Sequence, residues 1–130
     1  MANELILIIE DNEQNMKLAR DLLQVKGYRT LEANSAERGV ELARQHHPDL
    51  ILMDVQLPGM DGVEALKQLK SDPATASILV CAFTASAMKT DRERIVTAGF
   101  DAYLTKPIIV REFLENVRAL CDRKLGEGAA

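Results

Sequence analysis

Five short apolar runs recur along the chain, and the stretches between them alternate apolar and polar positions with a helical period. The runs cover residues 5–9, 28–33, 50–53, 78–83 and 102–104. Each run is too short for a buried helix, and most are rich in Val, Ile and Leu, as are strands that are covered on both faces. The pattern therefore predicts five strands, of which the second is weaker and the fifth is short.

The stretches between the runs predict five helices, because their apolar positions recur every three or four residues. These positions are Met16, Ala19 and Leu23; Ala36, Val40 and Ala43; Val63, Leu66 and Leu69; Met88, Ile95 and Ala98; and Phe113, Leu114, Val117, Leu120 and Cys121. Ser35 and Asp61, the latter with Glu64 three residues on, stand where N-terminal caps are expected. Gly27 and Gly99 stand where helices end. Strands that alternate with helices are joined by right-handed crossovers, so we expect a doubly wound α/β fold with a parallel sheet.

Length and composition are those of one ordinary globular domain. The chain has 130 residues, of which 47% are apolar and 28% are charged. We expect a domain over residues 1–125 and a flexible C-terminal tail over residues 126–130, with no linker or repeat between. The net charge of −4 is spread along the chain, which argues against binding to nucleic acid or to an anionic membrane, since both need a basic patch. No signal peptide or membrane anchor follows Met1, so we expect a complete single-domain protein in the cytoplasm.

Neither the cysteines nor the histidines form a metal-binding pattern. Cys81 and Cys121 have no partner at ligand spacing, so two free thiols, buried or half-buried, are expected. His46 and His47 end a predicted helix before Pro48, where a C-terminal cap is a better interpretation than a metal site.

Polar residues follow four of the five apolar runs: Glu10 and Asp11, Asp54, Thr84, and Lys106. Because the C-terminal ends of parallel strands lie at one edge of the sheet, we expect these side chains to be neighbours. Three carboxylates at close range repel one another by roughly 4 kcal/mol per pair at an effective dielectric constant of about 20. Lys106 and a divalent cation would offset that repulsion. An incomplete shell of carboxylates, without His or Cys, favours Mg²⁺ over both Ca²⁺ and zinc.

A carboxylate beside Mg²⁺ can attack phosphorus and form an acyl phosphate, so Asp54 is a candidate nucleophile. The hydroxyl group of Thr84 can donate to a phosphoryl oxygen, and Lys106 can offset its charge. Each residue also has a structural explanation. The acid pair after the first run, with Asn12 behind it, can cap the first helix, and Lys106 can be a solvated loop residue. The coincidence of these residues at four strand ends favours the chemical interpretation.

Four motifs, in this order along the chain, resemble the receiver domain of bacterial response regulators. They are Ile9-Glu10-Asp11-Asn12; Asp49 to Asp54 running into Leu57-Pro58-Gly59-Met60-Asp61-Gly62; Phe83-Thr84-Ala85; and Tyr103-Leu104-Thr105-Lys106-Pro107. Each motif alone is weak, but together they are highly specific and span nearly the whole chain. The resemblance implies a flavodoxin-like sheet with strand order 2-1-3-4-5. Glu10 departs from the family pattern, because many members have Asp there.

The resemblance also implies what the residues at this edge do. Asp54 would accept a phosphoryl group from a phosphohistidine on a histidine kinase or a histidine phosphotransfer protein. Mg²⁺ would be held by Glu10, Asp11, Asp54 and the backbone carbonyl of Gln56. Thr84 and Lys106 would contact the phosphoryl group, and a cis peptide before Pro107 would aim the lysine. Gln56 and Ser86 would flank the path of the water that removes the phosphoryl group.

Signal output would depend on a switch. In the family's pattern, Tyr103 would turn inward as Thr84 moves toward the phosphoryl group, and a downstream protein target would bind the changed surface. Ile108, Ile109 and Val110 beside that surface are candidate contacts or, equally, core residues at a helix entry. The phosphodonor would dock on residues of the first helix and of the loop after the last strand: Asn15, Met16, Leu18, Pro107 and Ile108.

Asn15, Met16 and Lys17 after the acid pair resemble single-domain regulators of the DivK type, although receivers from hybrid histidine kinases share Asn15. Such a protein catalyses only its own phosphotransfer and autodephosphorylation. One alternative is an interaction module that works without phosphorylation. Another is a Mg²⁺-dependent phosphatase of the haloacid dehalogenase type. Gln56 argues against the phosphatase, because those enzymes have an Asp general acid two residues after the nucleophile, and their nucleophile follows the first strand.

Overall fold

Five parallel strands form one sheet in the computed structural model, which describes residues 3–55, 62–84 and 89–129. The strands are β1 (Leu5–Ile9), β2 (Arg29–Ala33), β3 (Leu50–Asp54), β4 (Leu79–Thr84) and β5 (Ala102–Thr105). Their order in the sheet is β2-β1-β3-β4-β5, and each neighbouring pair is parallel. The doubly wound fold and the strand order 2-1-3-4-5 are therefore confirmed.

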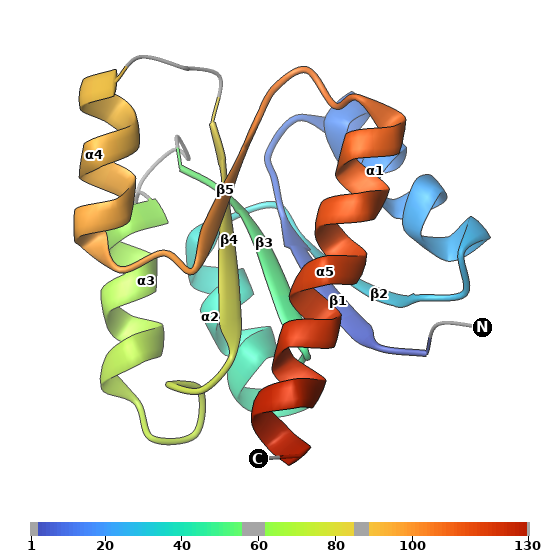
Figure 1. The fold of residues 1–130 in the computed structure, drawn as a ribbon. Coiled ribbons are helices and arrows are strands. Elements are labelled where there is room, and N and C mark those ends of the chain that lie inside the picture. The colour runs from blue at the N-terminus through green and yellow to red at the C-terminus, as the bar shows by residue number, and fades with distance from the viewer. Residues whose placement is uncertain (1–2, 56–61, 85–88, 130) are drawn as a thin grey trace.

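Helices cover both faces of the sheet (Figure 1). They are α1 (Glu13–Val25), α2 (Ala36–His46), α3 (Gly62–Ser71), α4 (Lys89–Ala98) and α5 (Val110–Ala129). One core cluster joins the sheet to α2, α3 and Ile95 of α4, and a second joins it to α1 and α5. Every residue of β3 is buried, because this central strand has a strand on each side and a helix layer on each face. No helix that the structure describes is both long and apolar enough to cross a bilayer.

Polar N-caps begin the helices, and residues with a positive φ angle end them, largely where the sequence predicts. Asn12 caps α1, since its side chain accepts a hydrogen bond from the backbone N–H of Asn15, and the helix begins three residues before its first buried position. Ser35 caps α2 in the same way. Gly27 and Gly99 have φ angles of 93° and 104°, which glycine adopts without steric cost. The predicted cap of Asp61 lies outside the described residues.

His47 confirms the predicted C-terminal cap of α2. It adopts the left-handed conformation with φ 48°, and its backbone N–H donates to the carbonyl of Ala43. Its imidazole Nδ1 lies 3.2 Å from the carbonyl oxygen of Ala74.

Two further sequence predictions concern the thiols and the C-terminus. Cys81 and Cys121 are both free and buried, as predicted, and burial raises the pKa of their thiols to about 12 and about 11. Helix α5 runs to Ala129, so it includes residues 126–129, which the sequence pattern assigns to a tail. Glycine in a helix costs only about 1 kcal/mol relative to alanine, so Gly126 does not by itself end the helix. Flexibility of this segment remains a prediction.

Helix α2 approaches β1 closely at Gly39. A Cβ atom on this residue would lie 2.3 Å from Cδ1 of Ile9 and 2.7 Å from its Cγ1. We expect Gly39→Ala to lower the free energy of unfolding by about 1–2 kcal/mol in urea denaturation, because overpacking outweighs the better helix propensity of alanine. The loss is expected to shrink in an Ile9→Val background, which removes the nearest atom. An equal loss in both backgrounds would show that this contact is not the cause.

Candidate functional site

The strand ends bring the predicted polar residues together at one edge of the sheet. Glu10 follows β1, Asp54 ends β3, Thr84 ends β4 and Lys106 follows β5. Carboxylate oxygens of Glu10, Asp11 and Asp54 all lie within 4.8 Å of one another. Glu10, Asp54 and Thr84 are only 5%, 6% and 4% exposed, whereas Asp11 is exposed.

Lys106 holds the two buried acids. Its Nζ atom lies 2.9 Å from Oδ2 of Asp54 and 2.9 Å from Oε2 of Glu10. Its backbone N–H donates to the carbonyl of Thr84 over 2.8 Å, and the Lys106–Pro107 peptide is cis, as the resemblance implies. The lysine is therefore not a solvated loop residue, because its backbone is tied to β4 and its ammonium group lies between two carboxylates.

Burial and charge oppose each other in the pKa values of this group. Burial raises the pKa of Glu10, the hydrogen bond from Lys106 acts against that rise, and the charge of Asp54 adds to it. Burial alone would lower the pKa of Lys106, but hydrogen bonds to Asp54 and Glu10 outweigh it and the pKa is raised. The ammonium form of Lys106 is thus stabilised by the acids that it pairs with.

Glu10 and Asp11, which follow β1, do not cap α1. Asn12 caps α1, so neither Glu10 nor Asp11 is needed for that purpose. Glu10 instead accepts a hydrogen bond from the backbone N–H of Asn12 through Oε1, over 3.1 Å, while its other oxygen contacts Lys106. Asp11 remains exposed beside two buried carboxylates, an oxygen-only donor set that fits a hard cation such as Mg²⁺.

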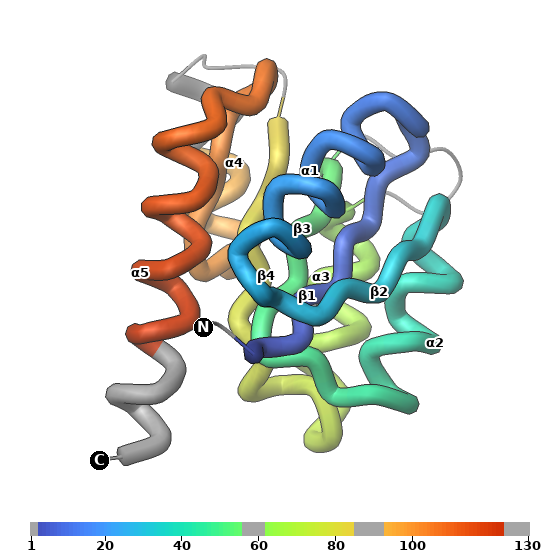
Figure 2. The backbone as a smooth tube through the Cα atoms, turned by 90° about the vertical axis from the view of Figure 1, so that its right-hand side faces the viewer, coloured from blue at the N-terminus to red at the C-terminus, as the bar shows by residue number. Residues whose placement is uncertain are grey.

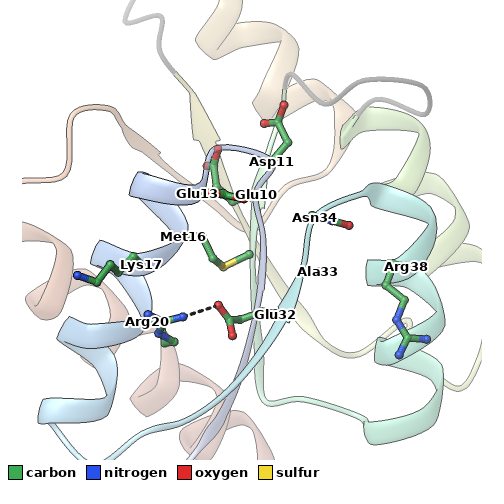
Figure 3. A pocket seen from close by; sticks show the side chains of 10 residues that line it. All are labelled: Glu10, Asp11, Glu13, Met16, Lys17, Arg20, Glu32, Ala33, Asn34 and Arg38. Carbon is green, nitrogen blue, oxygen red and sulfur yellow. Dashed lines mark hydrogen bonds and ion pairs between the residues drawn. The ribbon is translucent and has the colours of Figure 1, made fainter.

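A groove of about 610 Å³ opens from Glu10 and Asp11 and runs between α1 and α2 (Figure 3). Its lining residues are Glu10, Asp11, Glu13, Met16, Lys17, Arg20, Glu32, Ala33, Asn34 and Arg38. Arg20 crosses from α1 to β2, where its Nη1 atom lies 3.0 Å from Oε1 of Glu32. This groove is not among the features that the sequence predicts. The signal in the sequence is the charged flank Glu13, Lys17 and Arg20 of α1, whose three residues all line the groove.

The predicted docking residues differ in what they expose. Leu18 is 39% exposed and Pro107 is exposed, whereas Met16 is only 8% exposed and packs in the core. Asn15 and Ile108 are half-buried and line one small pocket together with Glu10 and Lys106. The accessible surface of the predicted docking residues therefore comes mainly from Asn15, Leu18, Pro107 and Ile108, and not from Met16.

Tyr103 is half-buried and packs against the core cluster beneath α2 and α3. It also lines a pocket of about 220 Å³ with residues of β5, of α5 and of the connection between them, among them Ile109 and Asn116. Gln56 and Ser86 lie outside the described residues.

Comparison with known proteins identifies the arrangement. Residues 6–118 match the sequence model of the response regulator receiver domain. The chain belongs to this family. The polar-differentiation response regulator DivK of Brucella ovis is 51% identical over 114 residues, which cover 88% of this chain and 93% of that protein. DivK of Brucella anthropi is 49% identical over the same shares. These receiver-family relatives support a response regulator of the DivK type.

Solved structures agree with this assignment. A putative response regulator from Chloroflexus aurantiacus superposes with a TM-score of 0.88 at 26% identity, over 93% of this chain and 99% of that one. The receiver domain of a sensor histidine kinase from Pseudomonas aeruginosa superposes with a TM-score of 0.86 at 30% identity, over the same shares. The latter was solved with a magnesium ion coordinated in its active-site cleft.

Lys106→Met is expected to lower the free energy of unfolding by about 3 kcal/mol without Mg²⁺, because it leaves two buried carboxylates without their cation. Mg²⁺ is expected to restore more stability to this variant than to the wild type, since the metal would then supply all of the compensating charge. Urea denaturation with and without Mg²⁺ measures both effects. Lys67→Met, which changes an exposed lysine of α3, is the control. A loss in Lys106→Met no larger than in this control would contradict the stabilising role of Lys106.

Proposed function

We propose that Asp54 is the phosphoacceptor of this response regulator and that a phosphohistidine on a histidine kinase or phosphotransfer protein is the donor. The observation that carries the proposal is the ammonium group of Lys106, 2.9 Å from Oδ2 of a carboxylate that is only 6% exposed. A buried acid held at the open edge of a rigid sheet, with a cation and two further acids beside it, suits phosphoryl transfer better than a structural role.

In the proposed reaction a carboxylate oxygen of Asp54 attacks the phosphorus atom. A P–O bond forms as the P–N bond to the donor imidazole breaks, and the electron pair stays on the imidazole nitrogen, which then takes a proton. The ammonium group of Lys106 moves from the carboxylate of Asp54 to a phosphoryl oxygen, and the hydroxyl group of Thr84 donates a hydrogen bond to another phosphoryl oxygen. Mg²⁺, when bound, supplies positive charge against the phosphoryl oxygens.

Glu10, Asp11 and Asp54 would hold the metal ion, together with the backbone carbonyl of Gln56. The donor set supports this assignment, since three carboxylates within 4.8 Å of one another carry more negative charge than one lysine neutralises. Glu10 would replace its contact with Lys106 by one with the metal and keep its hydrogen bond from the backbone N–H of Asn12, because the two contacts use different carboxylate oxygens.

The phosphorylated form would be recognised through the surface around Tyr103. Phosphorylation adds about −1.5 to −2 charges beside Thr84 and Lys106, and the backbone of Lys106 is already bonded to Thr84, so a shift in β4 reaches β5 directly. The output would be binding to a downstream protein in the cytoplasm, and the only reactions catalysed would be the chain's own phosphotransfer and autodephosphorylation.

Acetyl phosphate with Mg²⁺ is expected to add one phosphoryl group to the protein, measured as a mass shift of the intact chain. Asp54→Asn should abolish the adduct, because an amide oxygen is a far weaker nucleophile than a carboxylate. Asp21→Asn, which changes an exposed acid of α1, should leave it unchanged. An undiminished adduct on Asp54→Asn would refute the phosphoacceptor assignment, and no adduct on the wild type would favour the phosphorylation-independent module.

Beryllofluoride, which mimics a phosphoryl group on Asp54, is expected to shift the NMR signals of the Tyr103 ring. The chain provides its own control, because it has two tyrosines. Tyr28 is buried beneath Arg118 and immediately precedes β2, at the N-terminal edge of the sheet. The Tyr28 signals should stay in place at the same protein concentration, and Asp54→Asn should respond at neither ring. Unchanged Tyr103 signals in the wild type would count against the switch.

A further inference from the structure

The outward face of α5 has a sequence that is symmetric in charge and size. The residues on this face are Arg111, Leu114, Glu115, Arg118, Ala119 and Asp122. Their spacing of three and one places them on one side of the helix, opposite the buried positions Phe113, Val117 and Leu120. Along the helix the face presents a cation, an apolar residue and an anion, and then the same order again.

This order matches itself when two α5 helices lie antiparallel. About a twofold axis between Asn116 and Val117, Arg111 is level with Asp122 of the second copy, and Glu115 is level with Arg118 of the second copy. Leu114 is level with Ala119 of the second copy, which pairs a large side chain with a small one. All six positions thus meet a complementary residue, as an interface between identical subunits requires.

We propose that this face of α5 is a self-association surface, at which two copies of the chain pair through antiparallel α5 helices. Figure 2 shows α5 as the outermost element on its side of the molecule. Tyr103 lies on β5, on the other flank of α5, so the proposed surface differs from the switch surface of the proposed function.

The charges on this face are available to a second copy. Arg111 pairs with Glu115 of its own helix at 3.0 Å, yet these side chains are 89% and 65% exposed. Asp122 pairs with Arg118 at 2.9 Å and is 63% exposed. Exposed pairs within a helix are worth only about 0.3–0.5 kcal/mol, and each carboxylate has lone pairs left for a second cation.

Arg118 is already held in place for such a contact. Its guanidinium carbon lies 5.7 Å from the centre of the Tyr28 ring, and its nitrogens contact Glu4 and the hydroxyl oxygen of Tyr28. These contacts, with that to Asp122, occupy its N–H groups, so Arg118 faces Glu115 of the second copy as a fixed positive charge, and little side-chain entropy is lost on pairing.

Apolar surface next to the helix supports association. A groove of about 550 Å³ runs beside α5 and is lined by Lys26, Tyr28, Leu114, Glu115, Arg118, Ala119 and Asp122. A stable interface buries about 800 Å² on each partner, and one helix pair with part of this groove falls at the weak end of that range. We therefore expect a reversible, concentration-dependent dimer.

Two single charge reversals test the pairing without phosphorylation. Arg111→Glu and Asp122→Arg each place like charges opposite one another at both ends of the homodimer, so each alone should weaken self-association about tenfold or more. In an equimolar mixture the introduced carboxylate faces the introduced guanidinium, and the unchanged Asp122 faces the unchanged Arg111. Sedimentation velocity over a concentration series at low salt should therefore show dimer in the mixture and in the wild type, but little in either variant alone.

The mixture separates contacts between copies from effects within the helix. Each variant also creates a like-charge pair inside its own α5, and mixing two such proteins cannot relieve that pair. Arg38→Glu, which breaks a similar exposed pair with Glu41 on α2, is the matched control and should dimerise as the wild type does. A wild type that stays monomeric throughout, a mixture as monomeric as its components, or an equal loss in Arg38→Glu would each overturn the proposal.

Discussion

The ammonium group of Lys106 makes this site possible, because it lets two buried carboxylates lie side by side. Glu10 and Asp54 are each within 2.9 Å of Lys106 Nζ, and without that cation their repulsion would oppose the alignment of β1 and β3. Lys106 reaches them from β5, at the far side of β4, so the parallel sheet must bring three strand ends to one edge. The fold and the site therefore depend on the same charge balance.

The two ends of the sheet use acids in different ways. At the N-terminal ends of the strands, Asp49 accepts the backbone N–H of Leu5, and Asp101 accepts that of Val80. These carboxylates replace missing partners of the sheet and have a structural role. Asp54 stands only five residues from Asp49, at the opposite end of β3, and its Oδ2 atom accepts a hydrogen bond from the ammonium group of Lys106. A cationic partner can move to a phosphoryl oxygen, whereas a backbone partner cannot.

The sequence predicts the elements and the members of the site, but not the contacts among them. Apolar runs and helical periods indicate all five strands and five helices, because these patterns depend on which face is buried. The polar residues at strand ends follow from the parallel sheet. The pairing of Lys106 with Glu10 and the bridge from Arg20 to Glu32 were not predictable, because they depend on side-chain conformations across elements. Similarly, Tyr28 belongs to the apolar run but lies in the turn before β2. Its backbone N–H donates a hydrogen bond to the carbonyl of Leu23 in α1 and not to a neighbouring strand.

Helix α5 shows how one element can serve the core and the surface independently. Its inner positions, Phe113 and Val117, pack against the sheet with the ring of Phe113 stacked on Phe83 at 5.8 Å. Phe83 immediately precedes Thr84, so a movement of β4 reaches the inner face of α5. The charged residues of the outer face bond instead within α5 or to Glu4 near the N-terminus, and its half-buried Leu114 packs against the core cluster. The proposed pairing through exposed charges of the outer face therefore need not disturb the proposed switch, and a change at Thr84 need not break the pair.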